Sequence, residues 1–423
     1  MMADDIATVQ KEFENLNEYS IQFNKWFSKT IGVWPLPSST SKFEKIMTRI
    51  LILFCWIIAL FDAISGLLHF VLVKEDIIIK LKSLAPISYI FGGGLNYAVL
   101  LLRKDDILYC IEHMETDWKT ITRMTDRQIM LKNAKIGRII SCCILAFMQV
   151  SAVCFCTVLG VFKRTIKIGN ESMEIYVLPS PIYKIPVDTN PGHDIVLGFQ
   201  YLAAYITSAT VVSAFSFATV FACHASGQLT IMIIWIKEFI NRPQKENKNR
   251  IDEISVIIEH HMRILSFLER AEHLLSPICF MEMFKNILSI CLFSYCILAE
   301  WSEHNIRILG TYIFAVINIT LNTFLICYIG EVLTERCKKI GNMVYMTNWY
   351  RLPKKDILNL IMIITRSSVE YKITAGKIID MSVITFDNKN CFWIFKYITS
   401  NNNVINCTHN EYIKKYVSNI YSK

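Results

Sequence analysis

The histidines offer the most direct test for metal chemistry in this sequence. His260 and His261 are adjacent and follow Glu259. A zinc-binding helix needs two histidines four positions apart, because that spacing places both imidazoles on one face. We therefore expect no metal site and no cofactor, and we expect this pair on the solvated face of a helix. No other grouping of residues has the spacing of a catalytic site, so the chain is not expected to be an enzyme.

The fourteen cysteines could instead indicate disulfide or metal chemistry. Most of them lie within or beside apolar segments, and no Cys-x-x-Cys pair occurs. A free cysteine in an apolar setting behaves as a small hydrophobic residue. The cysteines are therefore expected to pack rather than to form a disulfide scaffold.

One carboxylate, Asp62, lies inside an apolar run of 24 residues, 50–73. A charged side chain at the centre of a bilayer costs about 2.5–3.5 kcal/mol on insertion scales. Asp62 is therefore expected to face other helices rather than lipid. A proton relay would need further titratable partners, and the other apolar segments offer few, so a structural role is favoured.

Aromatic residues gather at similar depths in several apolar segments. These residues are Tyr89, Phe91, Phe155, Phe199, Tyr201, Tyr205 and Tyr312. Together with the glycine run 92–94, they suit a pocket for a small, largely apolar molecule. The alternative is ordinary helix packing with an aromatic belt at the membrane interface.

Long apolar segments are the elements that must position these residues. Of 423 residues, 53% are hydrophobic and only 19% are charged. A membrane-spanning helix needs about 20 apolar residues, and the apolar segments are 50–73, 83–102, 139–162, 195–236, 286–299 and 308–330. A seventh segment from Ile357 onward is weak and broken. We predict an all-α, polytopic membrane protein with seven transmembrane helices.

The basic residues predict how these helices are oriented. Lys and Arg number 6, 3, 8, 4, 8, 1 and 6 in the successive segments between the spans. By the positive-inside rule, the N-terminus is cytosolic and, with seven helices, the C-terminus is extracellular. This orientation is opposite to that of G protein-coupled receptors. The basic excess therefore reports topology, and no nucleic-acid partner is expected. Asn170, in an Asn-Glu-Ser sequon on an outer segment, is a candidate for glycosylation.

Three regions follow from this topology. Residues 1–46 form a cytosolic N-terminal segment, residues 47–386 form the membrane domain, and residues 387–423 form an atypical tail. An outer loop, 163–194, holds four prolines and is expected to be an irregular lid.

The cytosolic loops 103–138 and 237–278 carry apolar residues at helical spacing, with Asp105 and Asp106 as possible N-caps. These loops are expected to form amphipathic helices that extend the spans into the cytosol. They either pack against their own chain or form an anchor domain, a platform on which subunits assemble.

An ordered series of motifs in the C-terminal third resembles the insect odorant receptor family. It begins with Cys327-Tyr328-Ile329-Gly330-Glu331 at the end of the sixth span. It continues through Tyr345, Trp349, Tyr350, Leu352, Pro353, Arg366, Ser367, Thr374, Ala375, Gly376 and Lys377. Gly32-Val33-Trp34-Pro35, just before the first span, resembles the N-terminal motif of the same family.

The resemblance implies a ligand-binding and channel-forming subunit in the plasma membrane of olfactory sensory neuron dendrites. Such proteins form hetero-tetramers with a shared olfactory co-receptor and open a cation channel when a small volatile odorant binds. The odorant lies among the outer halves of helices two to six. The seventh helix is split, so residues 357–366 would belong to the assembly platform and the pore half would begin near Ile378. The motif residues from Tyr345 to Lys377 would then serve assembly and gating.

The C-terminal tail departs from the family pattern. A helix over 378–398 would carry Asp380, Asp387, Lys389 and Lys396, which is costly for a helix that also faces lipid. The final segment is therefore hypothesised not to be a native pore helix. The alternatives to an odorant receptor are a gustatory receptor of the same superfamily or a non-functional receptor with a defective pore helix. A G protein-coupled receptor or a transporter fits the sequence less well.

Overall fold

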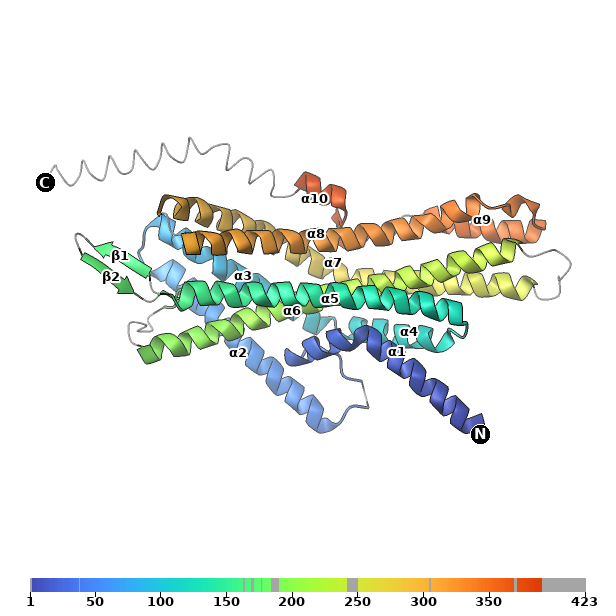
Figure 1. The fold of residues 1–423 in the computed structure, drawn as a ribbon, viewed down its shortest axis with the longest axis horizontal. Helices are drawn as coiled ribbons and strands as arrows, with labels where there is room; N and C mark the ends of the chain where they lie inside the picture. Colours follow the sequence, from blue (N-terminus) through green and yellow to red (C-terminus); the bar gives the residue numbers. More distant parts are fainter. Residues whose placement is uncertain are drawn as a thin grey trace.

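The computed structural model describes residues 2–37, 39–162, 164–168, 171–175, 177–183, 190–241, 250–303, 306–368 and 371–389. Nearly all of these residues are helical (Figure 1). The helices are α1 (Met2–Thr30), α2 (Lys42–Leu72), α3 (Ile77–Leu102), α4 (Lys104–Thr120), α5 (Met124–Gly160), α6 (Asn190–Asn241), α7 (Arg250–Glu303), α8 (Ile306–Tyr345), the 3-10 helix η2 (Trp349–Arg351), α9 (Lys354–Ser368) and α10 (Val383–Lys389). Two short hairpins complete the fold, β1 (Arg164–Ile168) with β2 (Glu171–Ile175) and β3 (Thr374–Ala375) with β4 (Ile379–Asp380).

Six helices of the described part are long and apolar enough to cross a membrane: α2, α3, α5, α6, α7 and α8. These six correspond to the six apolar segments of the sequence. The seventh helix was predicted to be split into two halves. These halves correspond to two separate helices, α9 and the short α10. Residues 390–423, most of the tail 387–423, lie outside the described residues.

The long helices extend well beyond one bilayer thickness. α6 has 52 residues and α7 has 54, so each is roughly 80 Å long, whereas the hydrocarbon core of a bilayer is about 30 Å thick. Figure 1 shows the ends of α6, α7 and α8 gathered with α4 and α9 at the end of the molecule opposite β1 and β2. We call the end with α4 and α9 the anchor, and the end with β1 and β2 the outer end.

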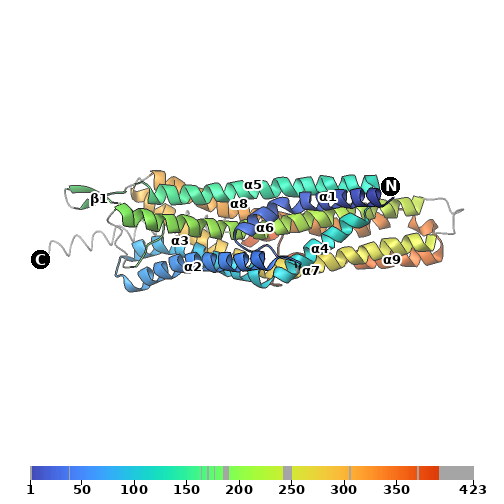
Figure 2. The same cartoon turned by 90° about the horizontal axis from the view of Figure 1, so that it is seen from below.

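α6 is the central helix of the bundle. It packs against α1, α2, α3, α5, α7 and α8, and Figure 2 shows it running between α5 and α3. α2 lies at the periphery and exposes a row of large apolar side chains, which include Leu53, Phe54, Ile57, Leu60 and Leu67. Such a surface is stable in contact with lipid rather than water.

The two apolar stripes predicted for the cytosolic loops are buried in the anchor. On α4 the stripe comprises Ile107, Ile111, Met114 and Trp118, and on α7 it comprises Ile257, Ile264, Leu268, Ala271 and Leu275. The prediction of the N-cap was wrong, because Asp105 and Asp106 lie inside the first turn of α4 and the cap is Arg103. Asp106 instead accepts a hydrogen bond of 3.0 Å from Arg270, which ties α4 to α7.

The Gly32-Val33-Trp34-Pro35 motif forms a buried turn after α1. Gly32 has a φ of +70°, a left-handed conformation that favours glycine. Its carbonyl accepts a hydrogen bond of 2.9 Å from Lys104, and the Trp34 ring stacks on Phe217 at 6.1 Å between centroids. The motif therefore fixes where the chain leaves α1 and enters α2.

The outer loop differs from the irregular lid predicted for residues 163–194. Its described residues begin with the antiparallel hairpin β1–β2, in which Arg164 pairs with Ile175. α6 already begins at Asn190, because Pro191 is compatible with the first turn of a helix. Irregular structure is thus confined, among the described residues, to the proline-containing part at 177–183.

A buried ionic cluster joins three helices of the anchor around Asp117 of α4. His224 Nε2 of α6 lies 2.8 Å from Asp117 Oδ2, and Arg263 of α7 donates a short hydrogen bond to Oδ1. Burial raises the pKa of the Asp117 carboxyl. This effect is outweighed by the hydrogen bond and charge of His224 and by the charges of His113 and Arg263, all of which lower the pKa. The net pKa lies below its usual value, so at neutral pH the charged carboxylate stabilises the fold.

Replacing Asp117 should therefore destabilise the anchor. Asp117→Asn should lower the free energy of unfolding by about 2 kcal/mol, because the buried His224 and the half-buried Arg263 lose a charged acceptor. The melting temperature Tm of the detergent-solubilised protein measures this effect. Glu115→Gln on the same helix is the control, since its pair with Lys119 is solvent-exposed and worth about 0–1 kcal/mol. Equal shifts in Tm for the two variants would contradict a stabilising role for the cluster.

Candidate functional site

A pocket lies among the transmembrane helices below the outer end. It contains about 680 Å³ of space not occupied by atoms, part of which is open to the surroundings. Its lining residues are Asp62, Pro86, Tyr89, Ile90, Met148, Ser151, Ala152, Phe155, Cys156, Pro179, Ser180, Gln200, Ala204, Phe293, Ala315, Asn318 and Ile319. They come from α2, α3, α5, α6, α7 and α8 and from the segment 177–183.

The lining has the composition of a small-molecule site. Most of the side chains are apolar or aromatic, and a few polar groups, among them Asp62, Gln200 and Asn318, converge on the same space. Ligand pockets in proteins are typically apolar clefts with a small number of polar groups that fix orientation. The pocket can therefore hold a small, largely apolar molecule.

The segment 177–183 covers one side of the pocket and is held in place by two helices. Gln200 of α6 donates a hydrogen bond of 2.6 Å to the carbonyl of Ser180. The Tyr183 amide donates one of 3.2 Å to Ser65 Oγ of α2. The proline-containing segment is thus a fixed wall of the pocket in this structure.

Three of the seven predicted aromatic residues gather at this pocket. Tyr89 and Phe155 line it. Tyr312 is buried behind the wall, where its ring lies 6.5 Å from Phe155 and 6.0 Å from Phe293. Phe155 and Phe293 meet edge to face at 5.9 Å, an arrangement that aromatic pairs favour.

The other four predicted residues lie elsewhere. Phe91 is 59% exposed and Phe199 is 39% exposed, on the outside of the bundle. Tyr201 contacts Thr157 of α5 through its hydroxyl at 2.7 Å, and Tyr205 donates a hydrogen bond to Thr30, the last residue of α1. These side chains point away from the pocket because of the rotation of their helices, which the sequence did not predict. Residues 200 and 204, one turn apart, form the pocket face of α6, so their neighbours point away.

Sequence reasoning missed most of the polar wall. Gln200 stands between two residues that were selected for their aromatic rings, and Asn318 lies inside the sixth apolar segment. Asp62 is buried, as predicted, but it faces the pocket rather than a structural partner alone. The available signal was that each of these three is a polar residue inside an apolar segment, where burial without a partner is costly.

Gly92 and Gly93 of the glycine run 92–94 make room for helix contacts rather than for the pocket. A Cβ at Gly92 would lie 2.5 Å from the Lys285 side chain, and one at Gly93 would lie 2.3 Å from Thr207. Lys285 forms a buried ion pair of 2.7 Å with Glu282. Its ammonium also lies 4.9 Å from the ring centroid of Tyr89, so this ion pair adjoins the pocket wall.

The Thr374-Ala375-Gly376-Lys377 motif forms the turn of the β3–β4 hairpin, which docks on α7. The Gly376 amide donates a hydrogen bond of 3.0 Å to the carbonyl of Ser276. Thr374 donates one of 2.6 Å to Glu272. Gly376 and Lys377 both have positive φ, so the chain reverses there.

This hairpin corrects the predicted start of the pore half of helix seven. Residues 379–380 pair with 374–375 instead of being helical, and α10 begins at Val383. Ser382 caps that helix through a hydrogen bond of 3.1 Å from the Thr385 amide. The helix therefore starts about five residues later than the resemblance implied.

The Gly330-Glu331 pair at the middle of α8 receives α10. A Cβ at Gly330 would lie 2.5 Å from the Met381 carbonyl oxygen, so glycine permits the close approach. Glu331 accepts a hydrogen bond of 2.6 Å from the Val383 amide, and the Phe386 ring packs edge to face on Phe324 at 5.3 Å. The motif thus positions the first turn of α10 against α8.

The remaining motif residues lie in the anchor. Tyr345, Tyr350, Pro353 and Arg366 are exposed, whereas Ser367 is buried and Trp349 is half-buried. The Trp349 indole donates a hydrogen bond of 3.2 Å to the Tyr345 carbonyl. These residues close the turn from α8 to α9 and leave several side chains free to contact another subunit.

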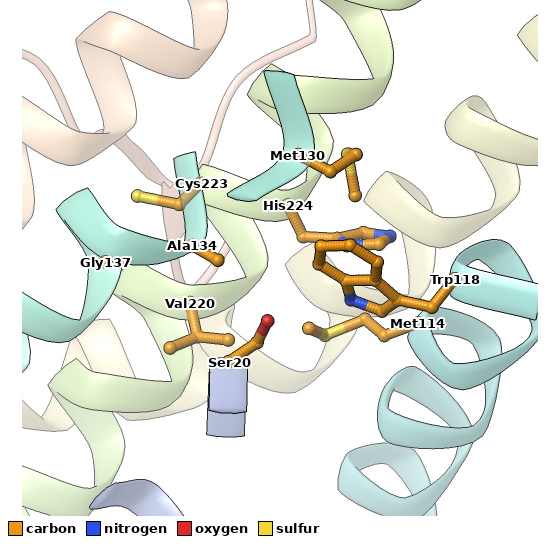
Figure 3. Close-up of a pocket in the computed structure, with 9 residues that line it drawn as sticks. All are labelled: Ser20, Met114, Trp118, Met130, Ala134, Gly137, Val220, Cys223 and His224. Carbon is orange, nitrogen blue, oxygen red and sulfur yellow. The ribbon is translucent and has the colours of Figure 1, made fainter. Parts of the chain in front are cut away.

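A smaller cavity lies in the anchor among α1, α4, α5 and α6 (Figure 3). It contains about 240 Å³ of space not occupied by atoms, and Figure 3 shows the Trp118 ring between Met114 and His224. This space is much smaller than that of the pocket among the transmembrane helices. We assign it to imperfect packing where four helices meet.

Two further expectations concern metal and sugar. The part of the chain that the structure describes contains no group of His, Cys, Asp or Glu side chains arranged to hold a metal ion. The pair His260 and His261 was expected on a solvated helix face. His261 is instead buried. Asn170 lies outside the described residues.

Comparison with known proteins identifies the relatives of this chain. The model of the 7tm odorant receptor family matches residues 80–389. Odorant receptor 10 of Aedes albopictus is 26% identical over 321 residues, which cover 74% of this chain and 81% of that relative.

Two solved structures have the same fold. The insect olfactory receptor OR5 from Machilis hrabei superposes with a TM-score of 0.70 at 13% identity, covering 92% of this chain and all (100%) of that chain. The structure of the same receptor in complex with eugenol gives a TM-score of 0.68 at 11% identity, covering 90% and 95% of the two chains.

Truncating a pocket aromatic should enlarge the pocket at a cost in stability. Phe155→Ala removes a ring that packs on Phe293 and Tyr312, so the free energy of unfolding should fall by about 3 kcal/mol. Toluene should restore part of the lost Tm of the detergent-solubilised variant, because its ring fits the apolar cavity left by the removed phenyl ring. Phe91→Ala on the exposed side of α3 is the control and should change Tm little, with or without toluene. Equal responses of the two variants would contradict the placement of the pocket.

Proposed function

The chain belongs to the insect odorant receptor family, and we propose that it is an odorant-binding subunit of a ligand-gated cation channel. It is a multi-pass membrane protein and not an enzyme. In this proposal a small volatile molecule binds in the pocket lined by Phe155 and Phe293, and the olfactory co-receptor completes the channel as a hetero-tetramer in the plasma membrane of the sensory dendrite. The observation that carries the proposal is the apolar pocket with few polar groups.

The position of α7 supports a route from the pocket to the pore helix. Lys285 of α7 lies against Tyr89 at the pocket wall. One to two turns along the same helix, the Phe280 ring is the group nearest to where a Cβ of Gly376 in the hairpin would lie. The Ser276 carbonyl accepts a hydrogen bond from the Gly376 amide. In this proposal, a movement of α7 at the pocket therefore also displaces the hairpin that leads into α10. A ligand shifts the closed–open equilibrium to the extent that it binds the open state more tightly.

The exposed surface of the anchor supports assembly with another subunit. α9 and the turn before it expose large apolar and aromatic side chains, namely Tyr345, Met346, Tyr350, Leu358 and Met362. This end carries the basic loops that the positive-inside rule places in the cytosol, where water rather than lipid surrounds the protein. Apolar groups exposed to water favour a protein–protein contact, and we propose the co-receptor as the partner.

Currents in a heterologous cell test the function. Cells that express this chain with the co-receptor should pass a cation current when exposed to some members of a volatile panel. Cells with the co-receptor alone should not respond to the same compounds. Surface biotinylation and co-purification establish that the subunits are present and assembled. Assembled subunits that give no odorant-dependent current above the co-receptor control would overturn the proposal.

The route through α7 makes a separate prediction. Phe280→Ala removes the ring that packs on Gly376 and should weaken coupling by about 1 kcal/mol, roughly a fivefold change in the closed–open equilibrium. The maximal odorant current per surface subunit should fall, while the apparent odorant affinity of the purified protein falls by at most about fivefold, because binding and gating are linked.

Phe284→Ala is the matched control for this variant. Phe284 is one turn along α7 and 64% exposed, against 38% for Phe280. It should retain the wild-type current. The same loss of current in both variants would argue against a specific contact between Phe280 and the hairpin.

A further inference from the structure

Among the residues that line the pocket, Asp62 carries the charged side chain. It is 1% exposed, and its one hydrogen bond recorded among the described residues is a long one, 3.4 Å from Gln200 Nε2 to Oδ1. The second oxygen, Oδ2, is buried without a hydrogen-bond partner. A buried carboxylate is stable only when it is paired or hydrogen-bonded. Of the polar atoms of the pocket, Oδ2 of Asp62 would therefore gain most from a hydrogen-bond donor.

Gln200 cannot meet that demand. Its Nε2 makes the shorter bond, 2.6 Å, to the Ser180 carbonyl, and its Oε1 accepts from the Ser180 amide at 3.4 Å. The glutamine is thereby committed to the wall segment. Two further oxygens of pocket-lining residues, Ser180 Oγ and Asn318 Oδ1, are also buried without a partner.

The basic side chains of the neighbouring helices are engaged elsewhere. Lys285 pairs with Glu282 at 2.7 Å, and Lys82 pairs with Glu300 at 2.9 Å. Within the described residues, no ion pair to Asp62 is formed. The pocket therefore has several acceptor oxygens and a negative charge, and the cations nearby are already neutralised.

Building on the proposed function, we propose that the ligand class of this pocket is a small, largely apolar molecule whose polar end is a hydrogen-bond donor, a hydroxyl or a protonated amine, held by Asp62. The apolar part of the ligand lies against Phe155, Phe293 and Ile319. A ligand that carries only an acceptor, such as an aldehyde or ester, would place its oxygen against the carboxylate. A site built around a specific hydrogen bond discriminates strongly against an analogue that cannot form it.

A matched series of compounds tests this class by binding and by current. n-Hexylamine, n-hexanol and n-hexanal share one carbon chain, as do benzylamine, benzyl alcohol and benzaldehyde. Binding is measured as ligand-dependent stabilisation of the purified complex of this chain with the co-receptor, and gating is measured as current. The amine or the alcohol should act at concentrations about tenfold lower than the aldehyde of the same series.

Asp62→Asn tests the residue and separates the two donors. Asparagine keeps the shape and an acceptor oxygen but loses the charge, so an amine should lose about tenfold or more in apparent affinity while an alcohol loses less. The aldehyde should be unaffected or improved, because the asparagine amide can donate. Ser180→Ala, which keeps the backbone bonds to Gln200, is a second variant and should reduce the preference for donors.

Asp76→Asn is the matched control, since it makes the same chemical change at an exposed position before α3. It should leave all affinities unchanged. Equal binding of amine, alcohol and aldehyde to the wild type, or an equal effect of Asp62→Asn and Asp76→Asn, would overturn the ligand class. So would the absence of binding by every compound. Preferential binding of donors without any current would support the ligand class while contradicting the channel function, so the two failures are distinguishable.

Discussion

The hydrocarbon core of a bilayer offers no hydrogen bonds, so every polar group of a spanning segment must find its partner inside the protein. This constraint explains why the described part of the chain crosses the membrane only as uninterrupted helices. It also explains the polar side chains of the bundle. Glu282 and Lys285 neutralise each other, and Asn96 donates to Glu282 at 2.6 Å.

A consequence of this continuity is that distant parts of the molecule share one helix. α7 lines the pocket at Phe293, holds the ion pair next to Tyr89, and then receives the β3–β4 hairpin at Ser276. The α-helix rises about 1.5 Å per residue, so these contacts lie within roughly 25 Å of one another on a single element. A stiff element that touches both the pocket and the hairpin before α10 needs no long chain of side-chain contacts to couple them.

The sequence predicted the elements better than it predicted their rotation. Apolar run length alone located the six spans, and the stripes Ile107–Trp118 and Ile257–Leu275 correctly predicted buried helix faces. It selected Phe91 and Phe199 for the pocket, because hydrophobicity cannot tell a lipid-facing aromatic from a pocket-facing one. Gln200 was missed although it is adjacent to Phe199. The start of α10 was also missed, since a turn made by Gly376 and Lys377 depends on its contact with α7.

Three buried carboxylates of this chain differ in a way that separates structural from ligand-binding roles. Asp117 is surrounded by His224, His113 and Arg263, and Glu282 is paired with Lys285. Both are neutralised by cations of the protein itself, so each holds helices together. Asp62 has a comparable burial and no such cation among the described residues, and it stands at a wall that a small molecule can reach. In the proposed ligand class, a donor that enters the pocket pairs with this carboxylate. The same physical rule that makes charges rare in spanning helices therefore makes Asp62 the residue by which the pocket can distinguish its ligands.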